Sequence, residues 1–64
     1  IRIVIPNSVT TIGEKAFAMC KNLSIFCEAS GLQEGWDDEW NYGNNPVYWA
    51  GEWEYIDGVP KPKE

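Results

Sequence analysis

Apolar and polar positions alternate at the start of the chain and predict an extended segment. Ile1, Ile3 and Ile5 fall on one face of such a strand, and Arg2 and Val4 fall on the other. Pro follows directly, and it ends the strand because it fixes φ and lacks a backbone donor. The pattern therefore predicts a first strand over these five residues.

A second alternation occurs further along, at Leu23, Ile25 and Cys27. The two segments superpose at a spacing of 22 residues, which places Ile3 on Ile25 and Ile5 on Cys27. A period in the low twenties, with one strand and one short helical turn in each unit, is typical of leucine-rich solenoids. The spacing thus indicates an internal repeat.

Between these segments, residue type and spacing favour a short helix. Residues 14–20 are rich in good helix formers, and Ala16, Phe17 and Cys20 follow helical spacing. Gly13 interrupts the preceding β-branched stretch. We expect a helix of one or two turns here.

The second half of the chain is rich in aromatic residues and predicts a β-hairpin. Residues 47–49 and 53–56 form two aromatic strand candidates, and residues 50–52 supply a turn between them. Trp36 and Trp40 are spaced as on one face of a helical turn.

Charge and composition exclude several classes of function. Ten acidic and five basic residues give a net charge of −5, which disfavours binding to nucleic acid or to an anionic membrane. The longest apolar run is too short to insert into a membrane. The chain starts inside an apolar stretch without a signal peptide and reads as an excised fragment. No His is present, which removes the commonest general base.

Residues 5–23 carry a recognisable repeat. They read IPNSVTTIGEKAF, with Cys20 and Leu23 completing the pattern, and this resembles the BspA-like leucine-rich-repeat unit IPxSVTxIGxxAFxxCxxL. The following CEASGLQEGWDDEWNYGNNPVYW is similar to the Trp-rich segment that ends many such arrays. The resemblance covers roughly residues 1–50.

Pattern and resemblance together imply an α+β fold. We expect a leucine-rich-repeat solenoid fragment, with short strands and one short helix per repeat, followed by an aromatic-rich C-terminal cap with a β-hairpin. The last repeat and the following strand would occupy residues 1–27, the cap 28–58 and a flexible tail 59–64. The residues implied to face the interior are Ile3, Ile5, Val9, Ile12, Ala16, Phe17, Cys20 and Leu23.

The resemblance also implies a function without catalysis. The chain would be the terminal repeat and cap of a secreted or cell-surface protein whose full array binds a protein partner, or adheres to a host or matrix surface. One repeat leaves an unpaired N-terminal strand edge, so a homodimer through that edge and the loss of upstream repeats are both open. A carboxylate pair such as Glu34 and Asp38 has glycosidase potential, but nothing distinguishes it from surface acids.

The aromatic residues have two interpretations. Flat rings could stack on sugars and form a small carbohydrate-binding module, or they could close the core of the cap, which we favour because so small a chain needs buried area. The candidate ligand-binding residues are Trp36, Tyr42, Tyr48, Trp49, Trp53 and Tyr55.

Cysteine and acidic residues give two further alternatives. Cys20 and Cys27 could form a disulfide or redox pair, but the family pattern favours buried core positions. A cluster of oxygen-bearing side chains could bind Ca²⁺, yet its spacing does not fit an EF-hand loop, so a solvated acidic turn is favoured. The residues of this cluster are Asp37, Asp38, Glu39, Asn41, Asn44 and Asn45. We therefore expect no metal site and no cofactor.

Overall fold

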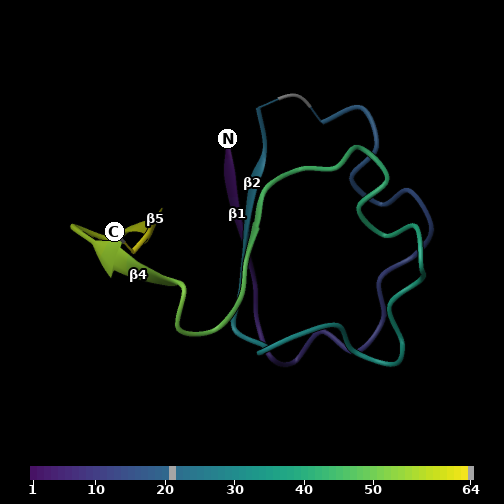
Figure 1. Cartoon of the computed structure of the whole chain (residues 1–64), viewed down its shortest axis with the longest axis horizontal. Coiled ribbons are helices and arrows are strands. Elements are labelled where there is room, and N and C mark those ends of the chain that lie inside the picture. Colours follow the sequence, from purple (N-terminus) through teal and green to yellow (C-terminus); the bar gives the residue numbers. More distant parts are fainter. Residues whose placement is uncertain (21, 64) are drawn as a thin grey trace.

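Three parallel strands form the main sheet of the computed structural model, which describes residues 1–20 and 22–63. Their order is β1 (Arg2–Ile5), β2 (Ser24–Cys27) and β3 (Val47–Tyr48). A separate antiparallel hairpin consists of β4 (Trp53–Ile56) and β5 (Val59–Pro62). Figure 1 shows the looped chain on one side of the main sheet and the hairpin on the other.

Neighbouring strands of the main sheet are offset by 22 residues. Ile3 lies beside Ile25, Ile5 lies beside Cys27, and Ile25 lies in turn beside Val47. The first two pairs are those that the repeat spacing aligned in the sequence. Two successive loops of chain therefore stack on each other, and each returns to the sheet one strand further along (Figure 1).

The predicted α+β class, with a short helix in each repeat, is wrong, because residues 1–20 and 22–63 contain strands, turns and coil but no helix. The expected helix is replaced by turn hydrogen bonds from Ala18 to Lys15 and from Cys20 to Phe17. Lys15 and Met19 adopt positive φ values of 56° and 66°, which a right-handed helix does not accommodate. The described fold is thus all-β.

The neighbouring loop explains why this segment does not become helical. The Lys15 N–H donates to the carbonyl of Glu39 at 2.9 Å. This backbone donor of the first loop therefore bonds to the second loop and not within its own segment. A second contact joins the same two loops, where Ile12 and Trp36 form a parallel bridge. Since one or two helical turns are marginal without tertiary support, these contacts between loops determine the conformation.

The predicted hairpin between residues 47–49 and 53–56 is wrong, because each of these segments pairs with a different strand. Val47–Tyr48 pairs in parallel with β2, whereas Trp53–Ile56 pairs with Val59–Pro62. The turn residues Asp57 and Gly58 have φ values of 54° and 80°, as a two-residue type I′ turn requires. The flexible-tail prediction is therefore wrong for Val59–Pro62, and its last residue, Glu64, lies outside the described residues.

The core fills the space between the sheet and the loops. Ala16 and Cys20, which the resemblance placed in the interior, are exposed. The buried core residues are Ile5, Ile12, Leu23, Ile25, Cys27, Trp36 and Trp40. Half-buried side chains packed against them are Ile3, Val9, Phe17, Val47 and Trp49. Two of the seven buried core residues, Trp36 and Trp40, are aromatic.

Candidate binding surfaces

Three tryptophans form an inner cluster within the core. The Trp36 ring stacks on Trp49, with centroids 5.9 Å apart, and lies 5.0 Å from Trp40. Trp36 and Trp40 are only 6% and 5% exposed. The inner cluster therefore holds the loops together and leaves these two rings little surface for a ligand.

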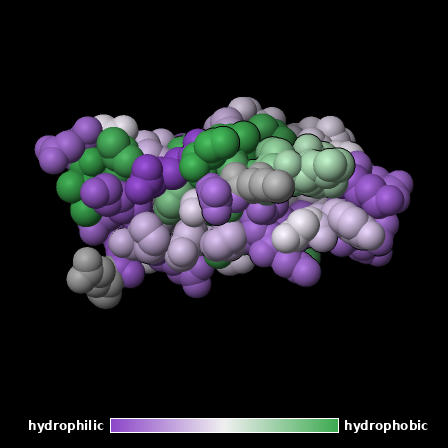
Figure 2. Space-filling view, turned by 90° about the horizontal axis from the view of Figure 1, so that it is seen from above, coloured by the Kyte–Doolittle hydropathy of each residue, from purple (hydrophilic) through white to green (hydrophobic). Residues whose placement is uncertain are grey.

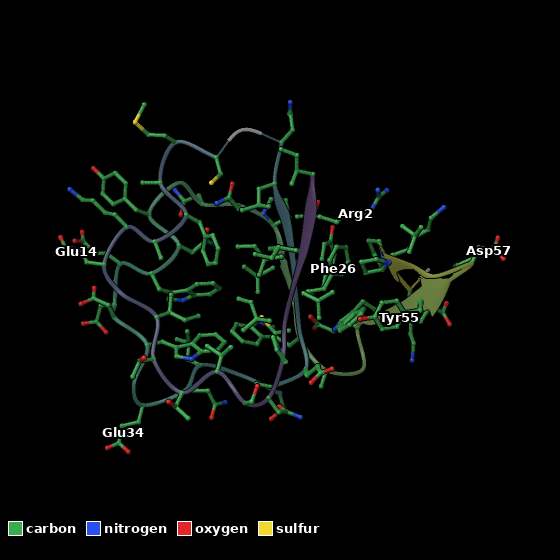
Figure 3. All side chains as sticks on the ribbon, turned by 180° about the vertical axis from the view of Figure 1, so that it is seen from behind. Arg2, Glu14, Phe26, Glu34, Tyr55 and Asp57 are labelled. Atoms are coloured by element: carbon green, nitrogen blue, oxygen red, sulfur yellow. The ribbon has the colours of Figure 1, made fainter. Side chains whose placement is uncertain are left out.

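A second group of rings, which we call the outer aromatic cluster, lies on the hairpin side of the main sheet. It consists of Phe26, Tyr48, Trp53 and Tyr55. Phe26 stacks on Tyr48 at 5.2 Å and contacts Trp53 at 5.4 Å, and Trp53 meets Tyr55 edge-on at 5.2 Å. Figure 3 shows Phe26 and Tyr55 on this side, away from Glu14 and Glu34.

The six candidate residues therefore do not form one platform. Trp36 and Trp49 belong to the inner cluster, while Tyr48, Trp53 and Tyr55 belong to the outer one. Tyr42 belongs to neither group, and the Lys15 Nζ lies 4.8 Å from its ring centroid. Only Tyr42 and Tyr55 of the six are largely exposed, at 55% and 56%.

The hairpin is attached to the main sheet where β3 ends. The Trp49 N–H donates to the Glu52 carboxylate, and the Ala50 N–H donates to the Ala29 carbonyl, so neither continues the ladder to β2. The Cys27 carbonyl instead accepts a hydrogen bond from Trp53 Nε1 at 2.8 Å. This bond, together with the packing of Trp53 on Phe26, fixes the start of β4.

The outer edge of β1 is unpaired within the described residues. Ser24 donates to the Ile1 carbonyl and Glu28 donates to the Ile5 carbonyl, so the odd-numbered residues of this strand face β2. The backbone groups of Arg2 and Val4 consequently point the other way. No described strand pairs with them, and this edge is a template for strand addition.

An acidic pair bridges the two loops at their periphery. A side-chain hydrogen bond with Glu14 raises the pKa of Glu39, and the negative charges of Glu14, Asp37 and Asp38 act in the same direction. The Glu39 N–H is itself bonded to the Asp37 carboxylate at 2.9 Å. The local hydrogen bond from Glu39 to Asp37 agrees with the acidic turn predicted at residues 37–39.

Both cysteines are free thiols in the structure. Cys27 is buried in the core, as expected, and burial raises its pKa to about 11. Cys20 is exposed, so its predicted interior position is wrong. The reason is the lost helix, because turn geometry directs residue 20 away from the loop interior.

The described residues offer no enclosed site for chemistry. Within residues 1–20 and 22–63, no three Asp, Glu or Cys side chains gather as metal ligands, and no pocket is present. No described helix is long and apolar enough to cross a membrane. No known protein family, curated protein or solved structure matches this chain.

The sequence prediction anticipated an unpaired edge on the first strand, but it did not identify the backbone groups on that edge. Arg2 and Val4 were placed on the face opposite Ile1, Ile3 and Ile5, and the side-chain pattern does not show whose backbone groups point to the free edge. Phe26 was also missed as the central ring of the outer aromatic cluster. Its signal was present, because it lies between Ile25 and Cys27 and must face away from the core.

Proposed function

We propose that this chain is a non-catalytic interaction module that binds a further polypeptide strand along the free edge of β1. The observation that carries the proposal is the unpaired backbone of Arg2 and Val4. Exposed strand edges recognise extended segments through main-chain hydrogen bonds, and alternate side chains supply specificity.

The partner strand requires a particular side-chain pattern. Ile3 and Ile5 of β1 align with Ile25 and Cys27 of β2 on the core side, and all four are apolar. An added strand would place apolar residues at the equivalent alternate positions. The partner is thus another protein segment of alternating pattern, and a second copy of this chain is one such partner.

The proposal includes a wider role, in which the chain is part of a secreted or cell-surface protein that mediates adhesion. It is supported by the resemblance of residues 5–23 to the bacterial surface repeat. The aromatic residues give less support to a carbohydrate module, because they are divided among three places.

Backbone methylation provides a direct test. The chain can be assembled by ligation at Cys27, with an N-methyl group on Val4 that removes an outward donor while leaving the side chain unchanged. The probe is a synthetic peptide of residues 1–6, titrated by isothermal calorimetry. We expect saturable binding to the parent chain and at least tenfold weaker binding after methylation.

A matched control replaces Gly13 by N-methylglycine, because no hydrogen bond is described for this exposed amide. Circular dichroism confirms that both methylated chains fold. Sedimentation equilibrium of the chain alone reports whether a second copy occupies the edge. Equal binding by parent and N-methyl-Val4 chains, or no binding to the parent at millimolar peptide, would contradict the proposal.

A further inference from the structure

We infer that the outer edge of β4 is a second strand-addition site, which takes an extended lysine-rich segment of a partner protein as a third strand of the hairpin. This inference is independent of the β1 edge, because it concerns a different sheet and a partner of different charge. It rests on the hydrogen-bond register of the hairpin, on two prolines and on the distribution of acidic residues.

The register shows which backbone groups of β4 are free. Ile56 pairs with Val59 directly beside the two-residue turn, and a type I′ hairpin makes this a hydrogen-bonded pair. At the other end, the Lys63 N–H donates to the Glu52 carbonyl at 2.9 Å. The even-numbered residues of β4 therefore bond to β5, and the backbone groups of Trp53 and Tyr55 point outward.

The opposite edge of the hairpin cannot accept a strand in the same way. The outward positions of β5 are Pro60 and Pro62, which lie across from Tyr55 and Trp53. Proline has no backbone N–H, so this edge presents carbonyl groups but no donors. Proline is one of the means by which proteins block edge pairing, and here it leaves β4 as the competent edge.

The outer edge of β4 is unpaired and its side chains are accessible. In the part of the chain that the structure describes, no other strand pairs with β4, and no hydrogen bond beyond the hairpin involves the backbone of Trp53 or Tyr55. Tyr55 is 56% exposed and Ile56 is 43% exposed. Figure 2 shows hydrophobic surface at the hairpin end of the molecule, between hydrophilic side chains.

The charges beside this edge select the partner. Glu54 is exposed on β4, and Glu52 and Asp57 flank the strand on either side. Within the hairpin, β5 already places a basic residue, Lys61, opposite Glu54 of β4. Opposite charges on paired strands are favourable, and the chain's net charge of −5 attracts a cationic segment over a longer range.

The experiment uses a defined probe, an acetylated peptide in which Val and Lys alternate over eight residues. It is titrated by calorimetry into the whole chain carrying N-methyl-Val4, whose β1 edge is blocked, and compared with a peptide in which Glu replaces every Lys. We expect the lysine peptide to bind, with an affinity that falls as salt rises, and the glutamate peptide not to bind. An N-methyl group on Tyr55 should weaken lysine-peptide binding at least tenfold, because it removes an outward donor.

Two controls separate this site from the β1 edge and from general attraction. N-methylation of Val4 blocks only β1, so lysine-peptide binding that remains in this chain, and is lost on further methylation of Tyr55, belongs to the β4 edge. Circular dichroism and tryptophan fluorescence establish that the N-methyl-Tyr55 chain is folded. Unchanged binding after Tyr55 methylation would assign the affinity to charge alone and overturn the inference, as would absence of binding by the N-methyl-Val4 chain at millimolar peptide.

Discussion

Trp53 Nε1 donates a hydrogen bond of 2.8 Å to the carbonyl oxygen of Cys27, 26 residues earlier in the chain. Cys27 is the last residue of β2, and β3 ends before it can supply the next ladder donor. The indole N–H thus satisfies a backbone group of a strand whose residues are largely buried. One side-chain bond therefore links the hairpin to the main sheet.

Replacing Trp53 with Phe should lower the free energy of unfolding by about 1 to 3 kcal/mol, because the Cys27 carbonyl loses its donor while most of the ring remains. Urea denaturation followed by circular dichroism measures the change. Tyr55→Phe is the matched control, since this exposed ring makes no hydrogen bond in the described residues and should change stability little. Equal stability of the two variants would show that the indole bond is unimportant.

Gly35→Ala should destabilise the chain by about 1 to 3 kcal/mol through overpacking. A Cβ at this position would collide with the backbone carbonyl of Thr10, where the two loops approach each other. Gly13→Ala is the control, because a Cβ there meets nothing within 4 Å. The urea midpoints of the two variants test the prediction, which fails if they fall by the same amount.

The acidic pair should make stability depend on pH in a defined direction. The folded chain raises the pKa of Glu39 above its ordinary 4.5, so the folded state binds this proton more tightly. Tighter proton binding by Glu39 stabilises the folded state below pH 4.5, and this contribution to the free energy of unfolding is lost as pH rises through the raised pKa. The cause is the proton that Glu39 shares with Glu14, together with the charges of Asp37 and Asp38.

Glu39→Gln should therefore raise the urea midpoint at pH 7, and its advantage over the parent should shrink as pH falls toward 4.5. Glu34→Gln serves as the control for simple loss of one exposed negative charge. A Glu39→Gln chain that follows the parent at every pH would show that the pair does not affect stability.

The two thiols should react at very different rates in the folded chain. Cys20 is exposed, whereas Cys27 is fully buried with a pKa raised to about 11. At pH 8 only on the order of one Cys27 thiol in a thousand would be ionised. A chromogenic disulfide reagent should titrate one thiol quickly and the second only after unfolding. Cys20→Ser should abolish the fast phase, and a fast phase that persists in this variant would contradict the assigned burial.

Local sequence predicted several strands well. The alternating apolar residues marked β1 and β2, and the aromatic run from residue 53 to 56 coincides with β4. The spacing of 22 residues also anticipated which side chains lie side by side in the main sheet. These features follow from side-chain period and residue type, which act over a few neighbouring positions.

The candidate surfaces depended on information that the sequence does not express locally. The run of aromatic residues indicated a capping core, and alternation along a strand separates Tyr48 from Trp49, but only the pairing of β3 with β2 showed which rings each of them contacts. The free edges of β1 and β4 are likewise defined by the partners on their other sides.

The sequence by itself determined where the chain can extend, where its repeat falls and which rings are available for a core. Tertiary structure decided that residues 14–19 form turns and that the aromatic strands take separate partners. The reason is the distance over which each interaction acts. A helix of one or two turns is barely stable alone, so contacts such as Lys15 with Glu39, formed only when the loops stack, determine the backbone.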